Sequence, residues 1–292
     1  MFKNGVYVIQ NKDTIYIPIY AYAYFLLLGN NQREGNVMAN LKMFDLTGKK
    51  AIVTGGGRGL GKGMAEGLCE AGAEVVLIGS SDSVVRAAAE FAEKGFKAHA
   101  VKGNLADEAA IEGIFNESLA ALGGRVDILI NNAGVQRRHK CEEFPLEDWN
   151  LVLQVNLNAV FTLCQLAGRK MLEQGYGKIV NMASMLSFFG GFTVPAYAAS
   201  KGGVAQLTKA LANEWSGRNV HVNAIAPGYM NTEMNTNLVN DEGRNKEILA
   251  RIPIGRWGTP DDMKGLAVFL SSPASDYING AVIPVDGGYL SK

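Results

Sequence analysis

Three side chains with complementary chemistry, a hydroxyl, a phenol and an ammonium, occur within eighteen residues of sequence in the second half of the chain. Tyr197 and Lys201 stand four residues apart, and Ser184 precedes Tyr197 by thirteen positions. On a helix, residues four apart share one face, so the ammonium of Lys201 can lie beneath the phenol of Tyr197. A neighbouring cation favours the ionised phenol, and we expect it to lower the pKa of Tyr197 from its usual value of about 10. Tyr197 could then exchange a proton with a substrate hydroxyl group, whose oxygen Ser184 can hydrogen-bond.

A glycine-rich turn over residues 54–61 is the second chemical signal. It reads Thr-Gly-Gly-Gly-Arg-Gly-Leu-Gly and connects a predicted strand to a predicted helix. Glycine permits a tight turn and a close backbone approach, and the free N–H groups at the start of the helix attract a pyrophosphate. The turn therefore predicts a dinucleotide site. We expect cofactor contacts here from Gly55, Gly57, Arg58, Gly59, Leu60 and Gly61.

From Lys50 onward, short apolar runs alternate with longer amphipathic ones, which is the pattern of strands separated by helices. We predict an α/β fold, namely a single-domain Rossmann-type, doubly wound parallel sheet of seven strands with helices on both faces. Pro145 is expected to begin a long helix, and residues 228–259 are expected to be irregular and to serve as a lid over the substrate. The strands are predicted at Ala51–Thr54, Glu74–Ile78, Lys97–Val101, Val126–Asn131, Lys178–Ala183, His221–Ala226 and Ala281–Val285.

Composition limits the classes of partner. The 28 Lys and Arg residues equal the 28 Asp and Glu residues, so no global charge draws the chain to nucleic acid or to an anionic membrane, and a small-molecule partner is expected. Cys69, Cys141 and Cys164 are widely spaced and are interpreted as reduced thiols of a cytoplasmic protein. The three histidines lack metal-ligand spacing, and no metal is predicted.

The beginning of the chain differs from the rest. Residues 15–28 form an apolar run interrupted only by Pro18, which is shorter than a membrane span of about 18 or more residues. A secretion signal is an alternative, but no clear small-x-small cleavage site follows. We predict that residues 1–42 are an N-terminal extension that is non-native or disordered, with translation starting at Met38 or Met43, and that residues 43–292 form the functional domain.

Several motifs occur together in a characteristic order. These are residues 54–61, Asn131-Asn132-Ala133-Gly134, Asn156, Ser184, Tyr197 with Lys201, and Pro227-Gly228. From about Leu46 to the C-terminus, the set resembles the short-chain dehydrogenases/reductases. The resemblance implies an NAD(P)-dependent dehydrogenase acting on CH–OH groups, with Asn156, Ser184, Tyr197 and Lys201 as catalytic residues. It also implies cofactor contacts from Ser80, Asn104, Leu105, Asn132, Ala133, Gly134, Tyr197, Lys201, Pro227, Gly228, Met230 and Thr232.

In the mechanism that this family implies, Tyr197 exchanges the proton of a hydroxyl group, Ser184 stabilises the substrate oxygen and Lys201 holds the nicotinamide ribose. Asn156 anchors a water molecule that links Lys201 to solvent. The alternative for Asn156 is a polar residue whose hydrogen bonds are satisfied inside a long helix.

A narrower resemblance rests on longer stretches, at residues 183–188, 223–230, 251–262, 275–280 and 285–288. They resemble the 2-dehydro-3-deoxy-D-gluconate 5-dehydrogenases, also described as 2-deoxy-D-gluconate 3-dehydrogenases, which act on sugar acids in uronate catabolism. Two alternatives share every catalytic residue: gluconate 5-dehydrogenase and 3-oxoacyl-thioester reductase. A third alternative, of another class, is a non-catalytic dinucleotide-binding sensor.

The family resemblance and the local residues favour different cofactors. The narrower family implies NAD, which we slightly favour over NADP. However, Gly79-Ser80-Ser81 stands where an acid would bind the ribose 2′-hydroxyl, and Arg58 could pair with a 2′-phosphate instead. Asn104 also departs from the family, which usually has an aspartate near the adenine.

Arginine suits a carboxylate because its guanidinium forms two parallel hydrogen bonds. Arg137 and Arg138 follow the Asn-Asn-Ala-Gly motif at the edge where ligands of such folds bind. We predict substrate contacts from Arg138, Ser184, Tyr197 and Tyr229, with solvated surface arginines as the alternative. The family resemblance further implies a homotetramer, assembled through the helices near residues 145–173 and 194–216 and through the C-terminal strand.

Overall fold

The computed structural model describes residues 5–10, 13–18 and 42–292, which belong to two units, Met1–Asp45 and Leu46–Lys292. In the first unit, β1 (Gly5–Gln10) pairs antiparallel with β2 (Asp13–Pro18), and η1 spans Lys42–Phe44. The predicted extension over residues 1–42 lies largely outside the described residues. Its boundary and the proposed start sites remain predictions.

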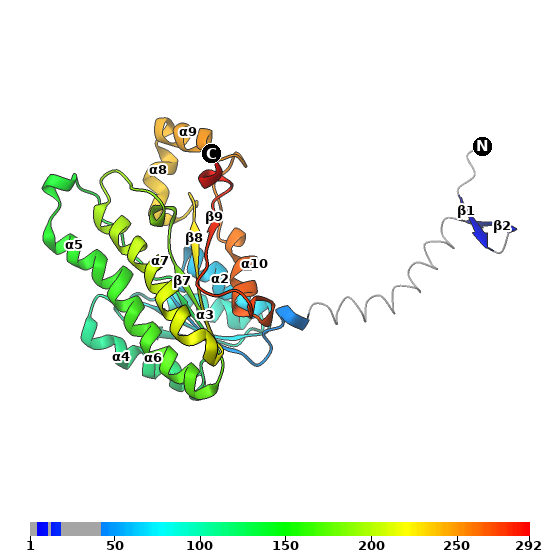
Figure 1. Cartoon of the computed structure of the whole chain (residues 1–292), viewed down its shortest axis with the longest axis horizontal. Helices are drawn as coiled ribbons and strands as arrows, with labels where there is room; N and C mark the ends of the chain where they lie inside the picture. Colours follow the sequence, from blue (N-terminus) through cyan, green and yellow to red (C-terminus); the bar gives the residue numbers. More distant parts are fainter. Residues whose placement is uncertain (1–4, 11–12, 19–41) are drawn as a thin grey trace. The chain divides into compact units, whose positions relative to one another are not determined.

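Seven parallel strands form the sheet of the second unit, in the order β5-β4-β3-β6-β7-β8-β9 (Figure 1). Every predicted strand is present, with ends within two residues of those expected from the apolar runs. The strands are β3 (Lys50–Thr54), β4 (Glu74–Gly79), β5 (Ala98–Lys102), β6 (Ile128–Asn131), β7 (Gly177–Met182), β8 (Val220–Pro227) and β9 (Val282–Val285).

Helices cover both faces of this sheet because neighbouring strand residues point to opposite sides. Ile52 enters the core with α4 (Ile111–Ala121), α6 (Ala159–Gln174) and α7 (Pro195–Trp215). Val53, the next residue, enters the core with α2 (Gly59–Glu70), α3 (Ser83–Glu93) and α10 (Asp261–Ser271). Figure 1 shows these two helical layers on either side of the strands. The predicted doubly wound fold is confirmed.

The strand order reverses between β3 and β6, and this reversal positions the site. The chain runs from β3 outward to β4 and β5, and then crosses to β6 on the other side of β3. The hydroxyl of Thr54, at the end of β3, accepts hydrogen bonds of 2.9 Å from the backbone N–H groups of both Asn132 and Ala133. The carboxyl ends of the two strands are thereby fixed at the crevice where ligands of such folds bind.

The long helix that Pro145 begins contains a local widening. After α5 (Leu146–Leu153), one π-helical turn, η4 (Gln154–Asn158), leads into α6. By length and composition, residues 146–174 could also cross a membrane, but half of the apolar window is buried inside the protein, as in a core helix. The π turn places Asn156, which is fully buried, under the loop that follows β6.

The region expected to be irregular is partly helical, so that prediction was wrong. It contains η7 (Glu233–Asn235), α8 (Thr236–Asn240) and α9 (Glu242–Arg251). In α9 only Ile248 is buried, so no apolar stripe marks the helix in the sequence. The helix begins instead with a cap, in which the Asp241 carboxylate accepts a 3.0 Å hydrogen bond from the N–H of Arg244.

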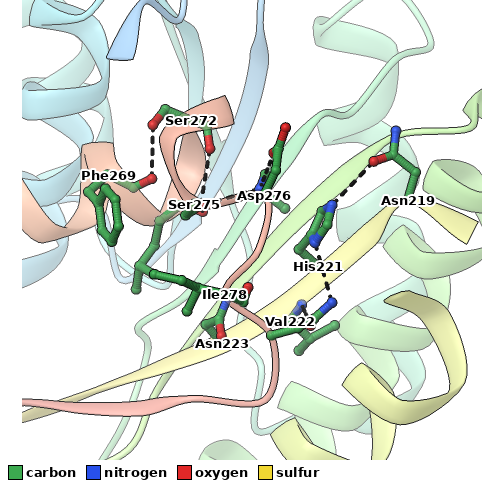
Figure 2. Close-up of polar contacts among 12 residues, drawn as sticks. Asn219, His221, Val222, Asn223, Phe269, Ser272, Ser275, Asp276 and Ile278 are labelled. Carbon is green, nitrogen blue, oxygen red and sulfur yellow. Dashed lines mark hydrogen bonds and ion pairs between the residues drawn. The ribbon is translucent and has the colours of Figure 1, made fainter. Parts of the chain in front are cut away.

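Polar side chains hold the segment that precedes the edge strand β9 against strands β7 and β8 (Figure 2). The Asn223 amide donates to the carbonyl of Ile278 (2.8 Å), and the buried Lys178 ammonium donates to Asp276 (2.7 Å). The segment that begins with η8 (Pro273–Ser275) is therefore held against β7 and β8. Further short turns are η2 (Glu108–Ala110), η3 (Cys141–Glu143), η5 (Met185–Ser187), η6 (Ser216–Arg218) and η9 (Tyr289–Ser291).

Candidate active site

A cavity of about 770 Å³ opens at the carboxyl ends of the strands. Every residue predicted to contact a cofactor lines it except Gly61, and Ser184 lines it as well. The predicted residues brought together in this way are Gly55, Gly57, Arg58, Gly59, Leu60, Ser80, Asn104, Leu105, Asn132, Ala133, Gly134, Ser184, Tyr197, Lys201, Pro227, Gly228, Met230 and Thr232.

The glycine turn is built so that backbone faces the cavity. Gly55 has a φ of +65°, and a Cβ there would lie 2.7 Å from the side-chain nitrogen of Asn132. A Cβ at Gly61 would lie 2.2 Å from the carbonyl oxygen of Gly55, so Gly61 allows the first turn of α2 to pack on the loop. No side chain caps α2, whose first N–H groups therefore remain available to a phosphate. The residues present fit the pyrophosphate of a dinucleotide.

Arg58 bridges the mouth of the cavity. Its guanidinium donates a 2.6 Å hydrogen bond to the carboxylate of Glu233, which belongs to the segment after β8. Both side chains are about 70% exposed, at 71% and 70%. An exposed ion pair of this kind contributes little to stability, so Arg58 can leave Glu233 for a ligand at small cost.

The end of β4 presents hydroxyl groups to the cavity. Ser80, Ser81 and Ser83 line it, whereas Asp82 does not. The Asp82 carboxylate accepts a 2.7 Å hydrogen bond from Lys102 instead. The cavity therefore has no carboxylate at the place where one would bind a ribose 2′-hydroxyl.

Ser184 is oriented by a short turn and by α7. Its hydroxyl accepts a 3.1 Å hydrogen bond from the N–H of Leu186, and its own N–H donates to the hydroxyl of Ser187 (3.2 Å). Ser187 in turn donates to the carbonyl of Lys201 (2.7 Å). Strand β7 and helix α7 thus fix the orientation of Ser184, whose hydroxyl favours the ionised form of the Tyr197 phenol and so lowers its pKa.

The electrostatics of Tyr197 differ from the sequence-based expectation. Burial raises the pKa of the phenol, while the Ser184 hydroxyl and the charge of Arg138 act in the opposite direction. The ammonium of Lys201 lies 5.5 Å from the phenol ring centroid but donates to the carbonyl of Met182 (2.6 Å). The net lowering of the Tyr197 pKa predicted from Lys201 was therefore wrong, because burial outweighs the nearby charges. Burial also lowers the pKa of Lys201 to about 8.

Asn156 lies beside the cavity rather than on its wall. Its carboxamide accepts from the N–H of Val135 (2.8 Å), donates to the carbonyl of the same residue (2.9 Å) and contacts the hydroxyl of Ser200 (3.3 Å). The side chain thus fixes the loop after β6. Its predicted role as the anchor of a water molecule stays a prediction.

The predicted substrate residues are more dispersed. Arg138 is exposed and does not line the cavity, although its charge acts on the phenol of Tyr197. Tyr229 lines a separate cavity of about 320 Å³ and packs edge-on against Trp257 and Tyr289.

Some cavity residues were not assigned from the sequence, among them Glu233 and Met234. They directly follow Thr232, which was assigned. Proximity in the chain was the signal available for them.

Comparison with known proteins gives consistent matches. Residues 55–290 match the family model described as enoyl-(acyl carrier protein) reductase. The 2-dehydro-3-deoxy-D-gluconate 5-dehydrogenase of Bacillus subtilis (strain 168) is 49% identical over 251 residues, which cover 85% of this chain and 97% of the relative.

Solved structures agree with this relationship. A proposed NAD(P)-dependent gluconate 5-dehydrogenase from Beutenbergia cavernae, with NADP bound at low occupancy, is 49% identical with a TM-score of 0.83; the match covers 86% of this chain and all (100%) of that one. A proposed 2-deoxy-D-gluconate 3-dehydrogenase from Agrobacterium tumefaciens with bound NADP is 46% identical, with a TM-score of 0.79 and coverage of 86% and 99%. The chain therefore belongs to the short-chain dehydrogenase/reductase family of NAD(P)-dependent dehydrogenases that act on CH–OH groups.

Proposed function

We propose that this chain interconverts a secondary hydroxyl group and a ketone on a sugar acid, as a 2-dehydro-3-deoxy-D-gluconate 5-dehydrogenase. The observation that carries the proposal is the convergence of Ser184, Tyr197 and Lys201 on one cavity with the glycine turn, while the charge of Arg138 reaches Tyr197. The names of the relatives support the same substrate class.

The proposed chemistry follows from the positions of these groups. Nicotinamide, when bound, supplies the carbon that accepts or donates the hydride. In the oxidation direction, Tyr197 removes the hydroxyl proton of the substrate, and Ser184 donates a hydrogen bond to the oxygen on which charge develops. Because burial raises the pKa of Tyr197, the phenol needs positive charge nearby to ionise near neutral pH.

Lys201 and Asn156 are proposed to complete the proton path. The Lys201 ammonium donates to the Met182 carbonyl and lies 5.5 Å from the ring centroid of Tyr197. We propose that it holds the ribose and stabilises the ionised phenol during turnover. Asn156 is proposed to connect it to solvent through a water molecule.

Carboxylate recognition is assigned to Arg138. Among the residues that the structure describes, no hydrogen bond or ion pair engages its side chain, whereas Arg137 is bound to Asp148. A guanidinium that has no partner in the described part of the chain and whose charge acts on the Tyr197 phenol is suited to bind an anionic substrate. Tyr229 is proposed to support the pocket wall through its neighbour Met230, which lines the cavity.

For the cofactor, we propose that the site accepts both NAD and NADP. The resemblance of the sequence favours NAD, but the hydroxyl groups after β4, the absence of Asp82 from the cavity and the releasable Arg58 all suit a 2′-phosphate. Structures of two relatives contain NADP.

The decisive test is nicotinamide absorbance with purified protein, offering each cofactor with 2-dehydro-3-deoxy-D-gluconate, gluconate and a hydroxyacyl thioester. Preferred turnover of the deoxy sugar acid supports the proposal. Turnover of gluconate alone would favour the second candidate, gluconate 5-dehydrogenase. The similarity to the proposed gluconate 5-dehydrogenase from Beutenbergia cavernae supports this candidate. Preferred thioester turnover would instead favour an acyl-thioester reductase.

A non-catalytic sensor requires the glycine turn but not the three reactive side chains. Loss of turnover in Tyr197→Phe, with cofactor binding retained in a fluorescence titration, would exclude it. Cofactor binding without turnover of any substrate by the wild-type protein would support it.

We further propose a cytoplasmic homotetramer. Cys69, Cys141 and Cys164 are all free thiols, which suits a reducing compartment. Leu146 on α5 and Phe161 on α6 are 77% and 46% exposed, so apolar surface on these helices is available for association.

A further inference from the structure

Asp148 is an acidic residue in the first turn of α5, and it faces the loop that carries Arg138. One carboxylate oxygen accepts a 3.0 Å hydrogen bond from Nε of Arg137, and the other pairs with Nε2 of His139 at 2.7 Å. A single carboxylate therefore holds both sequence neighbours of Arg138. Its side chain is 22% exposed, less than those of Arg137 (42%) and His139 (36%).

Further contacts restrain the same loop. The backbone N–H of His139 donates to the carbonyl of Thr193 (3.1 Å), in the segment that leads into α7. Thr193 has a φ of +63°, a left-handed conformation that costs energy for a β-branched residue and persists only where surrounding contacts impose it. The His139 ring also packs edge-on against Phe144, with centroids 5.1 Å apart. Residues 137–139 are thus anchored to both α5 and the segment before α7.

We propose that Asp148 is a positioning residue that fixes Arg138 for recognition of the substrate carboxylate. Because Asp148 engages Arg137 on one side and His139 on the other, the backbone of Arg138 has little freedom to turn, while its guanidinium stays uncommitted. The Asp148 carboxylate also neutralises Arg137, so of these two adjacent guanidinium groups only that of Arg138 keeps an unpaired charge. This inference rests on the proposed function, since it assigns the residue that orients the carboxylate-binding group.

The test compares an acid substrate with its uncharged isostere. Steady-state kinetics are measured with 2-dehydro-3-deoxy-D-gluconate and with the corresponding amide, for Asp148→Asn, Arg138→Ala and the double variant. We expect Asp148→Asn to lower kcat/KM for the acid on the order of tenfold, mainly through KM, with little change for the amide or in the KM for NADP. In the Arg138→Ala background, Asp148→Asn should have no further effect, because it acts through the missing guanidinium.

Two variants serve as controls. Glu147→Gln removes an exposed acid next to Asp148 in the same helical turn and should behave as wild type. His139→Gln loosens one of the two anchors and should give an intermediate loss, which keeps the proposal testable if Asp148→Asn folds poorly.

The outcomes separate the inference from the function on which it rests. If Arg138→Ala affects the acid and the amide equally, the assignment of the carboxylate to Arg138 is wrong, and the positioning role fails with it. If Arg138→Ala is selective for the acid but Asp148→Asn is not, or if their effects add, the proposed function survives and the inference about Asp148 is wrong.

Discussion

The ammonium of Lys201 is buried beside Tyr197, and burial lowers its pKa to about 8. Because the folded-state pKa lies below the unfolded value of about 10.4, the charge opposes folding at neutral pH. We therefore expect Lys201→Met to abolish turnover but to raise the free energy of unfolding of the cofactor-free protein by about 1–3 kcal/mol at pH 7. Urea denaturation measures the gain. Part of it is offset because the Met182 carbonyl loses its donor.

The sign of the effect also predicts a pH dependence. The unfolded chain binds more protons than the folded one between pH values of about 8 and 10.4, so wild-type stability should rise across this interval and that of Lys201→Met should not. Lys209→Met, at an exposed position of the same helix, is the matched control and should change stability little. Lower stability of Lys201→Met at pH 7 would contradict the argument.

At the other end of the cavity, Arg58 is expected to distinguish the two cofactors. Arg58→Ala should raise the KM for NADP about tenfold and leave that for NAD nearly unchanged, since only NADP offers a phosphate to the guanidinium. Glu233→Gln releases Arg58 from its ion pair and should leave the KM for NADP unchanged or lower it. An equal rise for both cofactors in Arg58→Ala would show that the residue stabilises the turn rather than selecting the cofactor.

Among the elements, strand β8 contains a histidine, His221, whose surroundings favour the neutral ring (Figure 2). His221 is 7% exposed; Nε2 lies 3.2 Å from the side-chain oxygen Oδ1 of Asn219, and Nδ1 lies 3.3 Å from the side-chain nitrogen Nδ2 of Asn279. A neutral ring donates from Nε2 to the Asn219 oxygen and accepts at Nδ1 from the Asn279 side-chain nitrogen. In a protonated ring, Nδ1 would carry a hydrogen that faces the N–H of Asn279. Burial and the charge of Lys178 lower the pKa of His221, against an opposing effect of Asp276.

A depressed histidine pKa makes stability depend on pH. The contribution of His221 should be complete above its unfolded pKa of about 6.5 and should be lost as the pH falls through that value toward the folded pKa. The difference in unfolding free energy between wild type and His221→Gln, measured by urea denaturation from pH values of about 8 to 5, isolates this residue from the other histidines. A difference that stays constant over this range would contradict the assignment.

These elements also show what the sequence could predict. Strands buried on both faces appear as continuous apolar runs, and the glycine turn with its following helix identifies the site locally. By contrast, α9 buries one side chain and gives no apolar periodicity. The pairing of Asp148 with residues 137 and 139 depends on the path of an irregular loop, and the preference of Lys201 for the Met182 carbonyl depends on burial. None of these three is encoded in short-range spacing.

For the whole molecule, association through the long helices is the remaining prediction. Phe161 lies on α6 with 46% of its surface exposed, and Leu146 begins α5 at 77% exposure. If these faces meet in a homotetramer, Phe161→Glu places a charge in an apolar contact and should shift the protein to smaller species at micromolar concentration. Light scattering coupled to size-exclusion chromatography measures the mass of each species.

The matched control is Val85→Glu, which changes a 48% exposed apolar residue on α3, outside the proposed interface. It should keep the mass of wild type. Since Phe161 lies on the solvent side of a helix whose opposite side packs on the sheet, the fold of Phe161→Glu should persist, with unchanged far-UV circular dichroism. A glutamate buried at a packed helix interface cannot be accommodated without a partner charge. A Phe161→Glu variant that remains tetrameric would therefore place the interface elsewhere. A wild-type protein that is monomeric throughout would contradict the homotetramer itself.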